Sequence, residues 1–549
     1  MYIDKSTVHL KNGKSYTRYL LRQCYREQGK IKHRTLANLS ACSADEVTAM
    51  QLAFKHKHDL TQITGTRPDV SSKQGKAIGA VWMLLTIAKR LGIEKALGTS
   101  EQGKLALWQV FSRIIEQGSR LSSTRLAMRH ACEVLGIKEF DEDKLYNNLD
   151  WLAEHQAEIE DELFALLNKN KDTQLFLYDV TSSYLEGICN ELAEFGYNRD
   201  GKKGKLQIVI GLLCDEEGTP ISIEVFTGNN RDHKTLTMQI KKAAFRFGVK
   251  RVTFIGDRGM IKSAQITELE DFNFHYITAI TKPQIQTLLD QGIMQLSLFD
   301  QELAEVNDHG VRYILRRNPI RMEELEKNRQ DKLRALQKVI DTRNVYAQLH
   351  LRAKDSTSLK MAIEYAKKLR INAWIEITLE ERQLKLKVDQ EKLTATSLFD
   401  GCYVIKTDVP VEVASKEIIH RSYKDLALVE QAFRTSKTVQ LEMRPIYVRL
   451  ADRTRGHVFV VMLAYRIIKE LTKYWQTLDV TVDEGIAALS SLCQIEITIN
   501  GQSYNQIPKP DALCEKLLQL AQVTLPTVLP KAYANVTTRK KLQTERKTI

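Results

Sequence analysis

Two short stretches decide the fold of this chain: Gln174-Leu-Phe-Leu-Tyr-Asp-Val180 and Arg251-Val-Thr-Phe-Ile-Gly-Asp257. Each is a short apolar run with an aspartate at its end, which predicts a buried strand that finishes in an acid. Neighbouring strand ends of one sheet converge on one edge, so Asp179 and Asp257 are expected to share a site. Taken alone, each aspartate would more simply belong to a turn or a helix cap. The flanking Gly256 and Gly259 favour the shared site, because they allow close approach to the backbone.

The stretches around these two complete a sheet. Strands are predicted over Leu206–Cys214 and Ile221–Thr227, joined by the turn Asp215-Glu-Glu-Gly218, and over Phe274–Ile280. Helices are predicted over Thr235–Phe247 and Ile261–Asp271. Three strands followed by helix, strand, helix and strand predict an α/β core with a mixed five-stranded sheet and flanking helices.

A third acid lies in Tyr423-Lys-Asp-Leu-Ala-Leu-Val-Glu430-Gln-Ala-Phe-Arg434-Thr-Ser-Lys437, within a long helix predicted over 416–438. Tyr423, Glu430 and Lys437 recur at every seventh residue, which places them on one helix face. The apolar side chains of Leu426, Val429 and Phe433 form a neighbouring stripe that can pack on the sheet. An exposed helical glutamate is the simpler alternative for Glu430.

Three carboxylates on one rim form an oxygen-rich site that suits Mg²⁺ or Mn²⁺. Two such ions can activate an attacking oxygen and stabilise the leaving oxygen in an in-line phosphoryl displacement. The candidate metal ligands are therefore Asp179, Asp257 and Glu430. With water as the attacking group the reaction is hydrolysis, and with a DNA 3′-hydroxyl it is strand transfer.

The basic charge of the chain favours a polyanionic partner, nucleic acid before an anionic membrane surface. Lys and Arg total 81 against 68 Asp and Glu, a net charge of +13. Nine of the basic residues lie in residues 1–34, against Asp4 and Glu27, and six lie in residues 531–549, against Glu545. The start lacks the form of a secretory signal, and no long apolar run follows, so a cytoplasmic, nucleoid-associated protein is expected. Eight scattered cysteines without a Cys-x-x-Cys pair indicate neither a zinc site nor disulfides.

Regions outside the core have their own patterns. The first forty residues predict short strands, with hairpin turns at Asn12-Gly13 and Gln28-Gly29. From Ala77 to Leu167 the apolar period is helical. Within it, Ser122 and Ser123 can cap a helix that carries Arg125 and Arg129 on one face. That helix could belong to a DNA-binding helix-turn-helix or to a solvated helical hairpin.

Residues 283–415 interrupt the rhythm of the core and predict an insertion with its own strands. It contains a charge-dense helix over about Arg321–Asp341 and an alternating stretch, Leu384-Lys-Leu-Lys-Val388. After the helix that carries Glu430, another long helix is predicted over Arg455–Tyr474.

Five stretches together resemble the DDE transposases of bacterial insertion sequences, in particular the subgroup with a Tyr-x2-Arg-x3-Glu-x6-Lys signature. They are YDVTSSYLEG at 178–187, GYNRDGKKGKLQIVIGLL at 196–213, FIGDRGM at 254–260, YITAITK at 276–282 and YKDLALVEQAFRTSK at 423–437. The resemblance covers most of 170–470 and implies that Asp179, Asp257 and Glu430 are the three catalytic acids. Single motifs of this kind are weak, but their combination is specific.

The resemblance also implies roles in DNA binding. Tyr423 and Lys437 fall on the signature's Tyr and Lys, which implies contacts to the transposon end near the cut. The signature's Arg falls on Leu426, so its phosphate contact must be lost or moved to Lys424 or Arg434. The turn Tyr197-Asn-Arg-Asp-Gly-Lys-Lys-Gly-Lys205 carries Arg199, Lys202, Lys203 and Lys205. It could meet phosphates near the active edge or be a solvated loop.

For the whole molecule, the resemblance implies an RNase H-like core interrupted by a mostly β insertion, acting as a homodimer on paired inverted-repeat ends. Members of the family excise DNA by cut and paste, some through a hairpin on the transposon end. The expected domains are a basic β-hairpin region (1–70), a helical DNA-binding domain (71–170), the first part of the core (171–282), the insertion (283–415), the second part of the core (416–480) and a C-terminal region with a basic tail (481–549).

Two alternatives stay open on the sequence. A nuclease with the same core would hydrolyse DNA without strand transfer, and the intact acids do not separate it from a transposase. A DNA-binding repressor with vestigial acids is the other alternative. All three acids in strand-end and helix contexts argue against that decay.

Overall fold

The computed structural model describes residues 1–10, 13–58, 70–167, 174–197, 199–230, 232–350, 352–438, 440–444, 446–499, 502–526 and 534–538. The described chain divides into two compact units. One contains Met1–Gly75 and Gln494–Ile507, and the other contains Lys76–Cys493 with Pro508–Pro526. The expected basic tail at 531–549 lies almost entirely outside the described residues.

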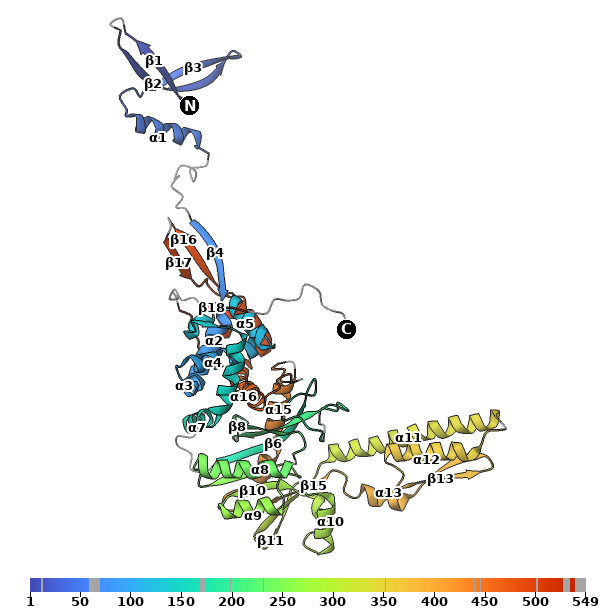
Figure 1. The fold of residues 1–549 in the computed structure, drawn as a ribbon. Helices are drawn as coiled ribbons and strands as arrows, with labels where there is room; N and C mark the ends of the chain where they lie inside the picture. Colours follow the sequence, from blue (N-terminus) through green and yellow to red (C-terminus); the bar gives the residue numbers. More distant parts are fainter. Residues whose placement is uncertain are drawn as a thin grey trace. The chain divides into compact units, whose positions relative to one another are not determined.

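The first unit is built from hairpins (Figure 1). Strands β1 (Tyr2–His9), β2 (Ser15–Glu27) and β3 (Lys30–Asn38) form an antiparallel sheet in that order. The predicted turn at Gln28-Gly29 is confirmed, because both residues have positive φ, 48° and 77°, and Glu27 pairs with Lys30. Of the other predicted turn, Asn12 lies outside the described residues, and Gly13 has a φ of 78°.

A helix and a second sheet complete this unit. Helix α1 (Ala44–Lys55) follows β3 and begins with a capping box between Ser43 and Glu46. A second sheet, in the order β17-β16-β4, joins Gln502–Gln506, Cys493–Ile499 and Val70–Ala77. Residues from near both ends of the chain thus pair in one sheet.

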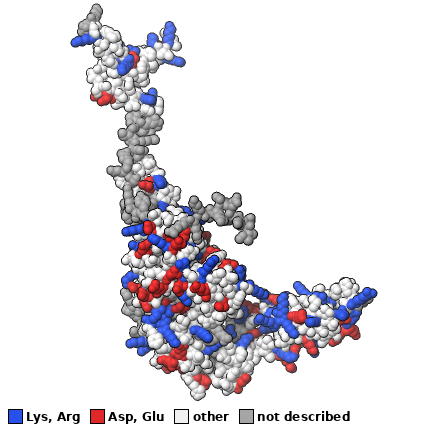
Figure 2. Space-filling model, viewed as in Figure 1, with Lys and Arg blue, Asp and Glu red and all other residues white. Residues whose placement is uncertain are grey.

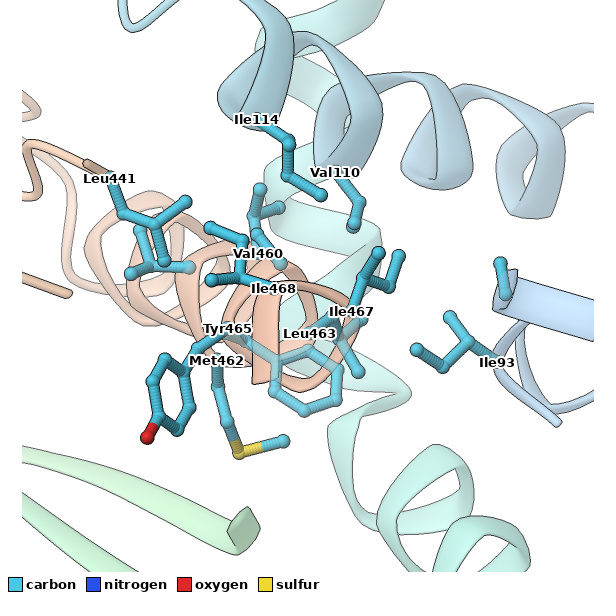
Figure 3. Close-up of a cluster of buried hydrophobic side chains, with 14 of the residues drawn as sticks. Ile93, Val110, Ile114, Leu441, Val460, Met462, Leu463, Tyr465, Ile467 and Ile468 are labelled. Atoms are coloured by element: carbon cyan, nitrogen blue, oxygen red, sulfur yellow. The ribbon is translucent and has the colours of Figure 1, made fainter. Parts of the chain in front are cut away.

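The predicted helical region is confirmed and begins the second unit. Its helices are α2 (Gly79–Arg90), α3 (Ile93–Leu97), α4 (Glu101–Ile115), α5 (Arg120–Arg129), α6 (Glu142–Glu154) and α7 (Gln156–Leu167). Of these helices, α2, α4 and α6 pack on α16 (Ala451–Trp475), the second predicted long helix. Figure 3 shows Ile93, Val110 and Ile114 against Val460, Leu463 and Ile467 of α16. Short elements complete this region: Cys132–Leu135, β5 (Glu139–Phe140), α17 (Val482–Ser490), α18 (Ala512–Leu520) and β18 (Asn535–Val536).

The cap predicted for α5 at Ser122 and Ser123 was wrong. The helix begins at Arg120, and the cap is Ser119, whose hydroxyl accepts a hydrogen bond from the backbone N–H of Ser122. The break at Gly118-Ser119 is therefore itself the start of the helix, because a serine there satisfies a free N–H of the first turn.

The central sheet has eight strands, in the order β11-β12-β15-β10-β9-β6-β7-β8. All five predicted strands are present, as β6 (Gln174–Tyr184), β7 (Gln207–Cys214), β8 (Pro220–Thr227), β9 (Val252–Gly256) and β10 (His275–Ala279). The prediction of five strands was wrong in number, because β11 (Ala304–Asp308), β12 (Val311–Arg317) and β15 (Cys402–Thr407) extend the same sheet beyond β10. The sequence predicted that the insertion has strands of its own, but not where these three begin or that they join the central sheet.

The prediction of a mostly β insertion was also wrong. Helix α11 (Pro319–Leu349) has 31 residues and packs on α12 (Asp355–Leu369), while the local sheet has only β13 (Ile375–Glu380) and β14 (Gln383–Val388). A separate small core of Leu336, Ile340, Ala366, Trp374 and Leu384 holds these helices to the hairpin. The alternating stretch at 384–388 is confirmed as β14. Helix α13 (Gln390–Ser397) leads back to the sheet (Figure 1).

Helices cover both faces of the central sheet. On one face, α8 (Asp232–Lys241), its π-helical continuation Lys242–Arg246 and α9 (Ser263–Asp271) cover β6 and β9. On the other face lie α15 (Leu426–Lys437) and α16. Beyond β10 are α10 (Lys282–Asp290), the turn Leu296–Asp300 and α14 (Lys416–Lys424).

None of the described helices combines the length and the apolar character needed to cross a membrane. Within the described ranges, none of the eight cysteines is joined in a disulfide.

Candidate active site

Asp179 and Asp257 lie side by side because β6 and β9 are parallel neighbours in register. Tyr178 pairs with Gly256, so the next residue of each strand is an aspartate. Strand β9 ends just before Asp257, as predicted, whereas β6 continues through Asp179 to Tyr184. The prediction that Asp179 ends its strand was therefore wrong. The strand continues because its second half pairs with β7, where Asp179 lies opposite Leu212.

The alternation of side chains decides which face the two acids occupy. Phe176 and Phe254 point into the core under α8 and α9, and Leu177 and Ile255 point into the core under α15 and α16. Side chains two residues apart share a face of a strand. Asp179, two residues after Leu177, therefore lies on the α15 side of the sheet. Asp257 follows the end of β9 two residues after Ile255, so the same alternation assigns it to the same side.

Helix α15 brings Glu430 to this face. Val429 and Phe433 are buried in the core and anchor the helix on β6, while Glu430 is exposed. The single long helix predicted over 416–438 was wrong, because the chain breaks between α14 and α15 at Asp425. Tyr423 thus belongs to α14, while Glu430 and Lys437 belong to α15. Leu426 is half-buried against the main core, a packing role that a charged side chain would not fill.

The three acids line one cavity of about 360 Å³. Its wall combines these carboxylates with three cationic side chains and a short apolar floor. The lining residues are Asp179, Val180, Thr181, Arg199, Asp257, Gly259, Met260, Glu430, Phe433, Arg434 and Lys437. Carboxylates and cationic side chains on one wall can bind metal cations and phosphate groups at the same time.

The electrostatics of the cavity centre on Asp179. Burial raises the pKa of Asp179 to about 7, with the charges of Asp257 and Glu430 adding to the rise and that of Arg199 opposing it. Asp257 is exposed, and its Oδ1 accepts hydrogen bonds from the backbone N–H of Arg258 at 2.7 Å and from the Tyr423 hydroxyl at 3.3 Å. Burial and the nearby Asp257 carboxylate raise the pKa of Tyr423, so its hydroxyl remains a donor.

This donor set suits a hard divalent cation in its chemistry. It offers carboxylate oxygens from three elements, and their mutual repulsion at Asp179 is the kind that a bound cation relieves. Across the described part of the chain, however, no three His, Cys, Asp or Glu side chains are grouped closely enough to hold one metal ion. The three carboxylates thus share a cavity without forming a closed ligand set.

Lys437 is tied into the protein rather than directed outward. Its Nζ donates to Thr181 Oγ1 at 2.7 Å and to Asp200 Oδ1 at 2.8 Å, and its side chain is 10% exposed. Asp200 is 2% exposed and also pairs with Arg444. Burial lowers the pKa of Lys437, while Asp200 opposes that shift. This ion-pair network fastens the end of α15 to β6 and to the loop before β7.

The other expected DNA-binding residues lie in different surroundings. Arg434 is exposed on the cavity wall. In the loop before β7, Lys202 and Lys203 are exposed, with the Lys202 Nζ 5.7 Å from the centre of the Tyr184 ring, and Lys205 pairs with Glu186. On α5, Arg125 is half-buried, and Arg129 is exposed and pairs with Glu116 at 2.7 Å. Neither Arg125 nor Arg129 lines the cavity of the acids.

Three residues of this region lay outside the candidate set drawn from the sequence. Arg199 lines the cavity and lowers the pKa of Asp179, yet it was considered only as part of a basic loop. Asp200 and Arg444 complete the network around Lys437. An acid within the basic run at 199–205 is the one signal that could have indicated Asp200 as a buried partner.

The surface of the described residues carries charge in several places. Figure 2 shows Lys and Arg on the unit that contains β1–β3 and, mixed with Asp and Glu, along the helices of the insertion. Strand β3 is exposed along its whole length and carries Lys30, Lys32 and Arg34. None of these three basic residues of β3 lines the cavity of the acids.

Comparisons with known proteins identify two family models in the chain. A model described as a transposase DDE domain matches residues 170–467, more than half of the chain. A model described as the N-terminal domain of IS1634 family transposases matches residues 3–69. The first match spans all three acids, and the second spans the β1–β3 sheet and α1.

Individual proteins are only distantly similar. No curated protein matches the chain. A cryo-EM structure of the piggyBac transposase synaptic complex with hairpin DNA is similar over 80% of this chain and 75% of that chain. Its sequence identity is 8% and its TM-score 0.34, which is too low to define the fold of this chain.

Proposed function

The chain belongs to the DDE transposases of bacterial insertion sequences, and on this basis we propose that Asp179, Asp257 and Glu430 are its catalytic acids. The observation that carries the proposal is their convergence on one cavity from a mid-strand position, a strand end and a helix. The enzyme cuts DNA during transposition, as its family does.

We propose that strands β6–β10 of the central sheet, together with α8, α9, α14 and α15, form an RNase H-like core. Its first part spans 171–282 and its second part 416–480, with the insertion at 283–415 between them. The region 71–170 is then the helical DNA-binding domain, 1–70 the basic β-hairpin region and 481–549 the C-terminal region. The antiparallel β6-β7-β8 followed by parallel β9 and β10 supports this assignment.

The three carboxylates would hold two Mg²⁺ or Mn²⁺ ions. When bound, such ions activate the attacking oxygen and stabilise the leaving oxygen of an in-line displacement at phosphorus. The protein's own contribution is positioning. The Tyr423 hydroxyl orients Asp257, and the Lys437–Asp200 pair fixes the end of the helix that carries Glu430.

The cations on the cavity wall would hold the DNA strand. Arg434 and Arg199 line the cavity beside the acids, where they can neutralise phosphates next to the scissile bond. Arg434 would supply the phosphate contact that Leu426 cannot make. Lys202 and Lys203 would meet phosphates further along the same strand, and Arg125 and Arg129 would contact DNA away from the cavity.

The proposed reaction is cut and paste: cleavage at the inverted-repeat ends of the element, then transfer of the freed 3′-hydroxyl into target DNA. A homodimer would hold the two ends together. The β1–β3 sheet would add contacts to DNA, because its basic side chains are exposed on β2 and β3.

A strand-transfer assay tests this proposal. The substrate is a duplex of the DNA end that flanks the gene, pre-cut to expose the 3′-hydroxyl of a strand that is labelled at its 5′ end. It is incubated with the full chain, Mg²⁺ and a supercoiled plasmid. The expected result is label covalently joined to plasmid, and no joining with Asp179→Asn. Cleavage of an uncut end without any joining would contradict the proposal and indicate a nuclease.

A further inference from the structure

A second cavity in the same unit is lined by arginines. It has a volume of about 300 Å³ and lies where the start of α5 meets the segment between α15 and α16. Its lining includes Arg113 of α4, Ser119 and Arg120 at the start of α5, and Glu442, Arg444 and His457. None of these residues lines the cavity of the acids.

Two of these arginines are buried without an ion pair. Arg113 is 6% exposed and Arg120 is 4% exposed. Within the described ranges, neither has a carboxylate within 4.0 Å, although the Glu442 carboxylate on the cavity wall favours the charge of Arg113 from further away. Burying a guanidinium without a paired anion is costly, so buried arginines are normally paired.

The hydrogen bonds of these arginines leave one buried N–H of Arg113 without a protein partner. Arg113 Nη2 donates to the carbonyl oxygen of Gly118 at 3.0 Å, but its buried Nε has no partner among the described residues. Arg120 Nη2 lies 2.9 Å from His457 Nδ1, and His457 Nε2 lies 3.4 Å from the carbonyl oxygen of Met443. Burial and the two arginines lower the pKa of His457, so a neutral ring accepts from Arg120 and donates to Met443.

The start of α5 adds a further attraction for anions. The first turn of a helix carries unpaired N–H groups and a partial positive charge. Gly118, Ser119 and Arg120 place this end of the helix on the cavity wall. The helix end and the unpartnered Arg113 Nε are independent features, and both favour a bound anion.

The second cavity is connected to the first by an ion-pair network. Arg444 lines the second cavity and pairs with Asp200, and Asp200 pairs with Lys437 on the wall of the first cavity. A DNA strand that runs through the first cavity would therefore have cationic groups on both sides of Asp200. The charges of the second cavity suit a phosphodiester, which is an anion with several acceptor oxygens.

We propose that this second cavity, lined by Arg113, Ser119, Arg120 and Arg444, binds a backbone phosphate of the DNA held at the active site. The inference rests on the proposed function, since it takes DNA as the substrate of the first cavity. It adds a phosphate site that is separate from the acids and from Arg434. The site anchors the strand and takes no part in the chemical step.

Ser119 offers a matched pair of variants. Asp and Asn both cap helices as well as Ser, so Ser119→Asp and Ser119→Asn should both fold. Only Ser119→Asp places a carboxylate at the mouth of the cavity, where it would pair with the arginines and repel a phosphate. Arg120→Lys is a second variant, which keeps the charge but removes the planar fork.

The test measures binding of the full chain to a fluorescent 30-base-pair duplex without divalent metal, over a range of NaCl concentrations. Each lost phosphate contact lowers the slope of log affinity against log salt by about 1. Ser119→Asp should lower the slope by about 1 and weaken binding several-fold at low salt, while Ser119→Asn should match the native chain. Arg120→Lys should weaken binding in the same direction.

Equal slopes for the native chain and Ser119→Asp would overturn the inference. Thermal unfolding with inorganic phosphate at constant ionic strength separates the two sources of phosphate. One outcome would be that inorganic phosphate stabilises the native chain and Ser119→Asn but not Ser119→Asp, while all three bind the duplex with the same salt slope. That result would indicate a site for free phosphate and would also overturn the assignment to DNA. Asp257→Asn should bind the duplex with the native slope, so failure of the proposed catalytic site is recognised separately, by cleavage that persists in that variant.

Discussion

At the residue scale, the site depends on register more than on residue type. Asp179 and Asp257 meet because Tyr178 pairs with Gly256 in two parallel strands, and both acids share the parity of the buried Leu177 and Ile255. The sequence predicted that these two acids would converge. It could not show that Asp179 lies in mid-strand, because the polar residues 181–183 that continue β6 do not resemble a buried strand.

Tyr423 is expected to act on the reaction through Asp257. Its hydroxyl is a donor to Asp257 Oδ1 at 3.3 Å, so Tyr423→Phe leaves the carboxylate free to rotate. We expect the single-turnover cleavage rate to fall by about tenfold, about 1.4 kcal/mol, and the Mg²⁺ concentration for half-maximal rate to rise. Tyr403→Phe is the control, since the Tyr403 hydroxyl contacts His420 instead. An unchanged Mg²⁺ requirement in Tyr423→Phe would refute this role.

The cationic residues were harder to predict than the acids. Sequence spacing placed Lys437 on the face of Glu430, and both line the cavity. The partners of Lys437 could not be predicted, because Asp200 lies 237 residues away and Arg444 follows a loop after α15. Pairings between distant loops depend on the tertiary fold, which no local pattern in the sequence records.

At the element scale, α15 is held on the sheet at both ends of its contact. Val429 and Phe433 pack into the core, and Lys437 pairs with the buried Asp200. We expect Lys437→Met to lower the free energy of unfolding by about 2–3 kcal/mol, less than for a fully unpaired buried charge because Arg444 remains beside Asp200. Urea unfolding measures the change. Lys424→Met, at an exposed position of α14, should leave the midpoint unchanged, and equal midpoints for both variants would contradict this account.

Helices α16 and α6 pack so closely at Gly456 that a methyl group added at this residue should force them apart. A Cβ on Gly456 would lie 2.2 Å from the carbonyl oxygen of Leu149. Alanine is the better helix former by about 1 kcal/mol, but overpacking against backbone costs about 1–3 kcal/mol. We expect Gly456→Ala to lower the melting temperature. A higher melting temperature would mean that helix propensity outweighs the close contact.

Element types were predicted better than their assembly. All five strands of the predicted sheet and the helical region after Ala77 are present. The eight-stranded sheet and the mainly helical character of the insertion were missed, since α11, α12, β13, β14 and α13 separate β12 from β15 along the chain. Membership of a sheet is a long-range pairing, and the break at Asp425 reflects how α14 and α15 pack on different strands.

At the scale of the whole molecule, the basic charge is distributed beyond the active site. The β1–β3 sheet carries exposed Arg26, Lys30 and Arg34. Replacing all three by Gln should lower the salt slope of duplex binding by up to about 3, with little change in the cleavage rate of bound DNA. Salt titrations of the native and substituted full chains provide the measurement. A native slope in the triple variant would exclude this sheet from the DNA contacts.

Asp179, Asp257 and Glu430 are proposed to perform metal-dependent DNA cleavage at the cavity that they share. Cleavage of a labelled duplex carrying the DNA end that flanks the gene, measured with and without Mg²⁺, tests this role. The native chain should cut at the end only with Mg²⁺, and Asp179→Asn, Asp257→Asn and Glu430→Gln should each bind the duplex without cutting it. Cleavage that persists in any of these three variants would contradict the assignment of that acid, and persistence in all three would contradict the site.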